Sequence, residues 1–293
     1  MAAMVEIAHG AARAVIAPNG AGLKSFEVGG VPYVETYDDE PPMGCGAVLV
    51  PWPNRTAGGR WTHAGEPQQL EITEPARGNA IHGLVRRVAW AVAERSEASV
   101  TLEVPVSGPG WPVELRTAIT YAVDGDGLTV THVVHNVGTA RTPFGVGTHP
   151  YPRAGTSETD ETSLSLAATT VLPLDTATMI PSGPAVPVEG DTDFQVARLL
   201  EGVHLDMPFG GCEPVDGLVR HVLRGPGGGV ELWADPDFKW VQVYTPATFP
   251  GRGRAVAVEP MTCPPDALNS GVDLLWLEPG GTWSGRWGLR PLA

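Results

Sequence analysis

The sequence predicts an all-β protein, a large antiparallel β-sandwich with very little helix, and three observations support this prediction. Many short segments, roughly twenty, alternate apolar and polar residues with the period of two that half-buried strands show. The 37 glycines and 29 prolines fall in no repeat or low-complexity run, so we interpret them as turns between strands. Residues 193–201 are the only stretch that favours a helix, of about two turns.

The N-terminal segments read as a strand meander with one buried face. Between residues 4 and 34, short alternating pieces are separated by turn sequences rich in glycine. The pieces are residues 5–7, 14–16, 24–28 and 31–34.

The clearest alternation lies between residues 89 and 136. Its strands are predicted at residues 90–94, 99–104, 115–123 and 128–136. Residues 124–127 (DGDG) form a tight turn, so the last two segments are consecutive antiparallel strands. His132 and His135 are three positions apart, so they point to opposite faces of a regular strand and should not share a metal ion.

The second half of the chain adds a loop-rich connection and further strands. Four prolines interrupt residues 156–190, which we interpret as a decorated connection within a domain. The later strands are predicted at residues 221–223, 229–234, 239–246, 255–259, 272–277 and 282–289. The 293 residues, 42% of them hydrophobic, can bury a large core and fit one large β domain or two ordinary ones.

The charge balance is strongly acidic. Nineteen lysines and arginines against 33 acids give a formal net charge of −14, which should repel nucleic acid and anionic membranes. Lys24 and Lys239 are the only lysines, and arginine cannot act as a general base or form a Schiff base at neutral pH. We therefore expect no nucleic-acid partner, no membrane partner and no lysine chemistry.

The cysteines and the N-terminus favour a cytoplasmic location. Cys45, Cys212 and Cys263 are widely spaced and contain no Cys-x-x-Cys pair, which argues against a disulfide framework or a zinc site. Residues 1–20 lack the basic start of an export signal, and no run of about 18 apolar residues occurs. We expect a protein that is neither exported nor inserted in a membrane.

Polar side chains follow a short apolar strand near residue 50. Pro51 and Pro53 should end the strand pairing and fix the backbone, so Asn54 and Arg55 would project from a stiff loop. Ligand contacts concentrate on such loops. The alternative is that Asn54 caps a turn and Arg55 lies on the surface.

Two further strands repeat this design. His149 follows an apolar strand and precedes Pro150, and Glu259 ends the strand at residues 255–259 just before Pro260. An ionised carboxylate on a buried strand is costly unless it is paired or its pKa is shifted, so Glu259 is a structural acid or a working base. Three strand ends of this kind suggest one shared cleft.

His82 and Asp206 are weaker candidates. His82 lies in the turn-rich loop at residues 71–87, where Gly83 leaves room beside the imidazole, but a lone histidine is more often structural. Asp206 precedes Pro208 and could equally cap a turn.

Together these side chains form an acid/base constellation without the spacing of a nucleophile or a metal site. The sequence has no serine-centred elbow, no His-Glu-x-x-His motif and no glycine-rich phosphate loop. We therefore expect acid/base chemistry that uses neither a metal nor a cofactor.

The chain resembles the aldose 1-epimerase, or galactose mutarotase, family over most of its length. The resemblance rests on short motifs that are specific in their order and spacing. They are residues 53–60 (PNRTAGGR), 79–83 (NAIHG), 147–151 (GTHPY), 205–206 (LD), 243–246 (VYTP) and 258–271 (VEPMTCPPDALNSG).

This resemblance implies one domain, residues 1–293, with a galactose mutarotase-like supersandwich that interconverts the α and β anomers of a free aldohexose. Glu259 matches the general base that takes the proton of the anomeric hydroxyl, and His149 matches the general acid at the ring oxygen. The substrate-binding positions are Asn54, Arg55, His82 and Asp206. The partner would be a small sugar, and the protein would be a monomer or a homodimer.

Two other functions fit the same fold. A hexose-6-phosphate epimerase would need an arginine cluster near the cleft, which Arg86 with Arg87, or Arg252 with Arg254, could supply. A non-catalytic sugar-binding protein would be expected to have lost the base, whereas Glu259 is present.

Departures from the family pattern leave the preferred sugar open. Pro152 replaces a frequent aromatic residue after the His-Pro-Tyr motif, and the chain is short for the galactose enzymes. Trp52, Trp61 or Trp233 could stack on a sugar ring, although each could also be a core residue.

Overall fold

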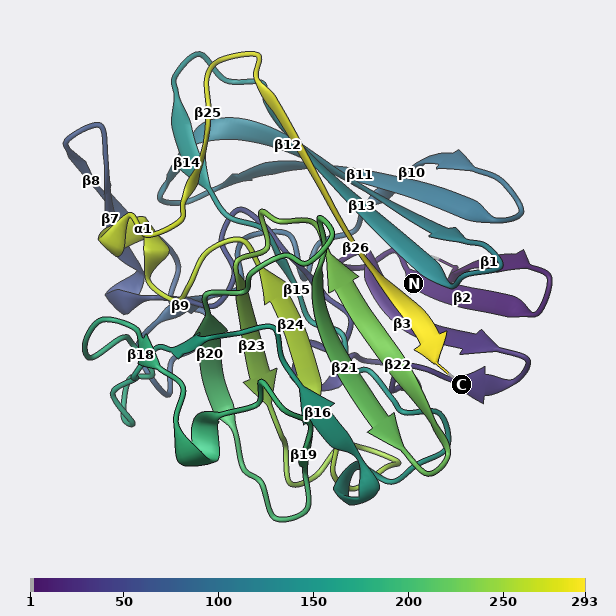
Figure 1. Cartoon of the computed structure of the whole chain (residues 1–293). Coiled ribbons are helices and arrows are strands. Elements are labelled where there is room, and N and C mark those ends of the chain that lie inside the picture. The colour runs from purple at the N-terminus through teal and green to yellow at the C-terminus, as the bar shows by residue number, and fades with distance from the viewer. Residues whose placement is uncertain (1–2, 293) are drawn as a thin grey trace.

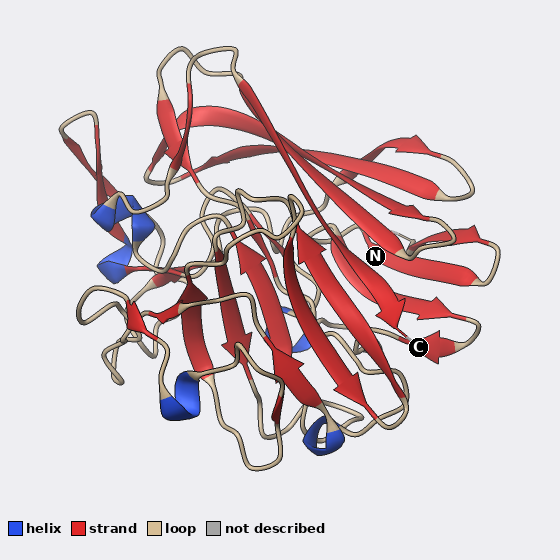
Figure 2. Cartoon of the chain, in the orientation of Figure 1, coloured by secondary structure: helices blue, strands red, loops and turns tan. Residues whose placement is uncertain are grey.

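The computed structural model describes residues 3–292 and contains strands in almost every part of the chain (Figure 1). Figure 2 shows that the helices are few and short. All strand pairs are antiparallel, and the two largest sheets have nine and seven strands. The prediction of an all-β sandwich with very little helix is confirmed.

The nine-stranded sheet carries the longest strands, which cross the upper part of the molecule in Figure 1. In spatial order it comprises β10 (Ala91–Arg95), β11 (Ser99–Gly108), β12 (Trp111–Val123), β13 (Leu128–Asn136), β26 (Thr282–Leu292), β22 (Gly228–Ala234), β21 (Val219–Gly225), β16 (Ser163–Ser165) and β19 (Arg198–Leu199). The predicted turn between β12 and β13 is confirmed, and the Asp124 carboxylate accepts the backbone N–H groups of Asp126 and Gly127. His132 is buried and His135 is not, so they do point to opposite faces.

The seven-stranded sheet is built from shorter strands. In spatial order it comprises β18 (Val186–Pro187), β17 (Thr170–Val171), β20 (Asp206–Gly210), β23 (Trp240–Tyr244), β24 (Ala257–Met261), β15 (Gly147–Thr148) and β5 (Val48–Leu49). Its central strands β20, β23 and β24 run side by side below the long strands in Figure 1.

Smaller sheets and single turns of helix complete the fold. The N-terminal meander is confirmed as a four-stranded sheet of β1 (Val5–His9), β2 (Ala12–Ala17), β3 (Gly22–Val28) and β4 (Val31–Pro32). Two-stranded pairs are β6 (Arg55–Thr56) with β9 (Ala80–Ile81), β7 (Arg60–His63) with β8 (Glu66–Gln69), and β14 (Thr142–Phe144) with β25 (Leu275–Leu277). The α-helix α1 is Ala267–Ser270, and 3-10 turns occur at Pro42–Gly44, Ala57–Gly59, Thr159–Glu161 and Gly190–Thr192.

The main hydrophobic core lies between the two large sheets. Leu223 and Leu232 of the nine-stranded sheet and Phe209, Val241 and Val258 of the seven-stranded sheet belong to the same buried cluster. Removing this apolar surface from water is the dominant stabilising contribution to such a fold. The assignment of residues 1–293 to one domain stays a prediction.

The helix predicted at residues 193–201 is wrong. Arg198–Leu199 instead forms β19, which pairs with β16 at the edge of the nine-stranded sheet. The Asp193 carboxylate accepts the N–H of Gln195 and turns the chain, and Val196 is 79% exposed, so no apolar helical face is buried. Pairing with the sheet and local turn chemistry override the weak helical pattern.

The three cysteines are buried and free. Within residues 3–292 no helix has the length and apolar character needed to cross a membrane.

Candidate active site

A cavity of about 720 Å³ opens at the seven-stranded sheet and gathers side chains from distant parts of the chain. Every site residue predicted from the sequence lines it. These residues are Asn54, Arg55, His82, His149, Asp206 and Glu259. These side chains therefore share one cleft, although Glu259 does not come from a strand end.

Glu259 lies in the middle of β24, not at its end as the sequence suggested. The strand continues through Pro260 to Met261, and Glu259 pairs with Gln242 of β23. Val258 and Thr262 donate their backbone N–H groups to carbonyls on the β15 side, at Pro150 and Val146. The missing N–H of Pro260 falls on that same side, where β15 is only two residues long, so the proline does not end the strand.

Asn54 and His149 stand where the sequence placed them, beside short strands. His149 directly follows β15, and its N–H donates to the carbonyl of Ala47. Asn54 directly precedes β6 and has a positive φ of 56°. Both Asn54 and Arg55 are buried, so the alternative of a surface arginine is wrong.

The centre of the site is a contact between an acid and an imidazole. Oε1 of Glu259 lies 3.3 Å from Nε2 of His149, and both side chains are buried. The His149 ring stacks on Tyr151 with centroids 5.2 Å apart and meets the edge of His82 at 5.5 Å. On another side, a Cβ at Gly44 would lie 3.0 Å from Cδ2 of His149. The imidazole is therefore held in one orientation by its neighbours.

Burial moves both pKa values toward the neutral forms. Burial, and then the nearby Asp206, raise the pKa of Glu259 well above its usual range, while Arg55 opposes the shift. Burial lowers the pKa of His149 to about 3, with a further lowering by Arg86. Because the two groups touch, they titrate as a pair, and one shared proton can be on either partner without a change in net charge.

Glu259 and His149 each have one polar atom that their mutual contact does not use. Oε2 of Glu259 and Nδ1 of His149 are buried and form no hydrogen bond with the residues described. A buried polar atom without a partner is destabilising, so it is an observation that calls for a ligand or a catalytic role.

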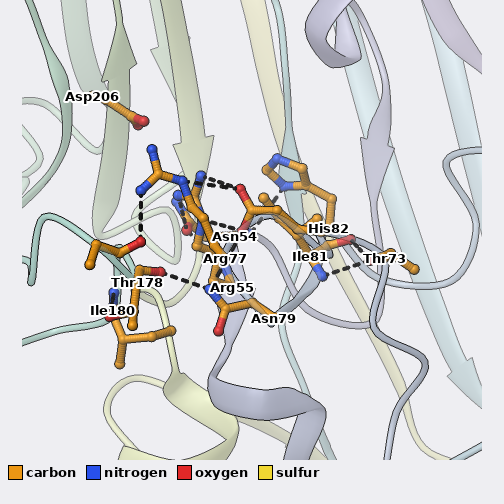
Figure 3. Close-up of polar contacts among 12 residues, drawn as sticks. Asn54, Arg55, Thr73, Arg77, Asn79, Ile81, His82, Thr178, Ile180 and Asp206 are labelled. Atoms are coloured by element: carbon orange, nitrogen blue, oxygen red, sulfur yellow. Dashed lines mark hydrogen bonds and ion pairs between the residues drawn. The ribbon is translucent and has the colours of Figure 1, made fainter.

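His82 is fixed as a hydrogen-bond donor. The backbone N–H of Asn54 donates to Nδ1 of His82 at 3.2 Å, so the neutral ring carries its proton on Nε2 (Figure 3). Burial, and then the positive charges around it, lower the pKa of His82 well below its usual range and favour this neutral form. The role of His82 in substrate binding stays a prediction.

Arg55 is held by an acid that the sequence analysis missed. Its Nε and one terminal nitrogen (Nη2) each donate to a different carboxylate oxygen of Glu74 at 2.9 Å. Nε of Arg77 lies 3.6 Å from the same carboxylate. Such paired contacts fix the plane of a guanidinium group. Nothing in the sequence pattern distinguishes Glu74 from the other acids of its loop.

Gln242 was also missed, although the sequence contained a signal for it. Its Nε2 donates to Asp206 at 2.6 Å, and its Oε1 accepts from Nδ2 of Asn54 at 3.1 Å. Asp206 is the first residue of β20 and faces the cavity instead of capping a turn. Burial raises the pKa of Asp206, while Arg55 and the Gln242 hydrogen bond lower it. A lone amide within the apolar strand Trp240–Tyr244 could have indicated this role.

None of the three candidate tryptophans lines this cavity. Trp52 and Trp61 are buried and stack on Trp111, with centroid distances of 5.8 Å and 5.0 Å. Trp233 belongs to β22 in the other large sheet. The aromatic side chain of Tyr244 lines the cavity instead.

Comparisons with known proteins identify the family of this chain. The sequence model of the aldose 1-epimerase family matches residues 3–290. The uncharacterised protein YihR of Escherichia coli K12 is 35% identical over 94% of this chain and 89% of its own length. Rat galactose mutarotase is 34% identical over 63% of this chain, a match that spans about half (54%) of that enzyme.

Solved structures share the whole fold. A galactose mutarotase-like protein of Clostridium acetobutylicum superposes with a TM-score of 0.86 at 18% identity, covering 98% of this chain and 94% of the other. An aldose epimerase homologue of Caenorhabditis elegans gives 0.84 at 18% identity, covering 99% of both chains. At this level of identity the structures establish the fold, and the sequence match establishes the family. The chain belongs to the aldose 1-epimerase family.

Proposed function

We propose that the protein is an aldose 1-epimerase that interconverts the α and β anomers of an aldohexose by acid/base-catalysed ring opening. The observation that supports this most strongly is the contact of Glu259 with His149, 3.3 Å apart and buried at a cavity large enough for a hexose. Family membership supports the same reaction class.

In the proposed reaction, the ionised Glu259 removes the proton of the anomeric hydroxyl while protonated His149 donates to the ring oxygen. The O–H bonding pair becomes the carbonyl bond at C1, and the C1–O5 pair goes to the ring oxygen as it is protonated. The two groups are direct neighbours, with Oε1 of Glu259 3.3 Å from Nε2 of His149. Adjacency is sufficient because both reacting oxygens are bonded to C1.

Glu259 and His149 return to their starting protonation states after one round of the proposed reaction. Ring opening converts the ionised Glu259 and protonated His149 into the neutral acid and neutral imidazole, which is the state that burial favours. After C1 rotates, closure on the other face of the aldehyde runs the same transfers backwards. The pair returns to its starting state without a proton from solvent.

The remaining side chains would hold the sugar. We assign hydroxyl contacts to Asp206 and Asn54, which Gln242 aligns, and to Arg55, which Glu74 aligns. His82 would donate from Nε2 on the ring-oxygen side. These contacts need neither a metal nor a cofactor.

NMR saturation transfer between anomeric protons tests this proposal directly. We expect enhanced exchange for at least one sugar in a panel of glucose, galactose and other aldohexoses. Glu259→Gln should keep the fold and lower kcat by about 10² to 10⁴, the usual contribution of one proton-transfer group. Glu278→Gln, which changes a carboxylate that is 72% exposed, is the matched control.

Two results would count against the proposal. Wild-type exchange in a folded Glu259→Gln variant would remove Glu259 from the role of base. Failure to accelerate any sugar, neutral or charged, would remove the epimerase activity itself.

A further inference from the structure

Two neighbouring arginines line the cavity without a carboxylate partner. Arg86 and Arg87 line the 720 Å³ cavity and also a second cavity of about 220 Å³ that shares them. Between residues 3 and 292, neither guanidinium group forms an ion pair. Acids outnumber basic residues by 33 to 19 in this chain, so two unpaired cations in one cavity wall call for a ligand.

The backbone that carries the two arginines is fixed from the opposite side. The side-chain amide of Asn19 lies 3.2 Å from the carbonyl oxygens of Arg87 and Val88 and can donate to both. Gly20 donates its N–H to Val88 at 2.8 Å and has a φ of 72°. A Cβ at Gly20 would overlap the carbonyl of Arg86, so the close approach requires glycine. These contacts therefore fix the backbone from which the two arginine side chains project.

The buried acids of the larger cavity have partners other than these two arginines. Glu74 accepts two hydrogen bonds from Arg55, Asp206 accepts one from Gln242, and Glu259 contacts His149. Glu40 is exposed at the larger cavity, and Glu71 lines the smaller one.

Arg86 remains charged at neutral pH. Burial, and then Arg87, lower the pKa of Arg86 to about 10, while Glu74 opposes the shift. Arg87 itself is exposed. The site therefore presents two cations, one of them partly desolvated, and partial desolvation strengthens the attraction for an anion.

Arg86 and Arg87 follow His82 in the same loop and line the same cavity as His82 and His149. Arg86 also acts on the pKa values of both imidazoles. In the proposed reaction His149 donates a proton to the ring oxygen. In a hexopyranose this oxygen is bonded to C1 and C5. The exocyclic C6 is attached to C5, so a group beside the histidines is placed to face the C6 substituent.

We propose that Arg86 and Arg87 bind an anionic group at C6, so that the preferred substrates are hexoses carrying a phosphate, a sulfate or a carboxylate there. This inference rests on the proposed function, because the position of C6 follows from the role of His149. The shared chemistry is an oxyanion held by charge-assisted hydrogen bonds from two guanidinium groups.

The test compares charged and neutral sugars on the same enzyme. Anomeric exchange is measured for glucose, glucose 6-phosphate, glucose 6-sulfate and glucuronate, each corrected for the uncatalysed rate. The readout is the ratio of kcat/KM for each anionic sugar to that for glucose. We expect a ratio above about 10 for at least one of them, since an ionic hydrogen bond commonly contributes that much.

Substitution of the two arginines tests whether they cause the preference for anionic sugars. The double variant Arg86→Gln/Arg87→Gln should lower the ratio about 10- to 100-fold, and Arg87→Gln alone, at an exposed position, should lower it in the same direction. Arg116→Gln is the matched control, because Arg116 is 56% exposed on β12 and does not line the cavity. The sugar with the highest ratio identifies the anion.

Failure of this inference can be separated from failure of the proposed function. A wild-type ratio of one or less, or a ratio that the double variant leaves unchanged, overturns the anion site and leaves the epimerase proposal standing. If no sugar is turned over, calorimetric binding of the three anionic sugars decides. Binding of any of them that the double variant loses supports the anion site, and binding of none of them to the wild type overturns it.

Discussion

His149 and His132 are both buried imidazoles, and burial lowers the pKa of each to about 3. His132 lies in β13 of the nine-stranded sheet, where its Nε2 accepts from Trp287 at 3.0 Å and its ring faces Phe238. His149 follows β15 of the seven-stranded sheet, 3.3 Å from Glu259 and at the cavity. The same shift thus occurs in a sealed core and in the candidate site.

A shifted pKa therefore does not by itself identify a catalytic group. Desolvation alone is sufficient for the shift at His132. What distinguishes His149 is a proton partner within contact distance and a cavity that a ligand can enter.

Substitution of the two histidines should separate catalysis from stability. His149→Gln should lower kcat by about 10² to 10⁴, because it removes the proposed proton donor to the ring oxygen. His132→Gln should leave kcat within about threefold of the wild type, since its role is to accept the Trp287 hydrogen bond. Anomeric exchange rates and melting temperatures of both variants measure the two effects. An equal loss of kcat in both would refute the distinction.

Acid should destabilise the fold through its buried histidines. Burial lowers the pKa of His132 from 6.5 in the unfolded chain to about 3 in the folded protein. The unfolded chain therefore binds the proton first, and folding stability is lost as the pH falls through 6.5. For one such group the loss reaches about 2 kcal/mol by about pH 5. Urea unfolding at neutral and at acid pH should show the stability gap between wild type and His132→Gln shrinking by this amount. A gap that does not depend on pH would contradict the burial shift.

The packing of Gly44 against His149 should have the smallest effect. Gly44→Ala places a methyl group 3.0 Å from the imidazole, which should displace the ring and lower kcat about 3- to 10-fold. Gly10→Ala is a matched control, because Gly10 also has a positive φ but nothing lies within 4 Å of the added Cβ. Steady-state rates of the two variants give the comparison. Similar losses in both would mean that backbone strain, and not ring displacement, is responsible.

Much of the fold follows from local patterns. The hairpin of β12 and β13 was predictable because alternation and a tight turn agree. The helix expected at residues 193–201 failed because β19 pairs with β16, a contact that no local pattern reports. Glu259 was found as an acid on a buried strand, but its central position in β24 depends on the short neighbour β15, which the sequence does not reveal.

The site was predictable where a polar residue interrupts an apolar pattern. His149 and Glu259 stood out in this way, and Gln242 could have done so. Glu74 could not, because its importance comes from a bidentate contact with Arg55, 19 residues away. The contact between Glu259 and His149 likewise joins residues that are 110 positions apart and is visible only in the folded chain.

The candidate site residues come from two kinds of structure, strands of a sheet and a loop. Glu259 lies on a strand with neighbours on both sides and His149 directly follows one, whereas Arg86 and Arg87 belong to a loop that packs against Asn19 and Gly20. A strand in a sheet cannot shift without breaking ladders on both sides, but a loop can change its length or side chains at little cost. If the loop changes, the proposed choice of sugar can change with it, while the sheet keeps the proposed acid/base pair in place.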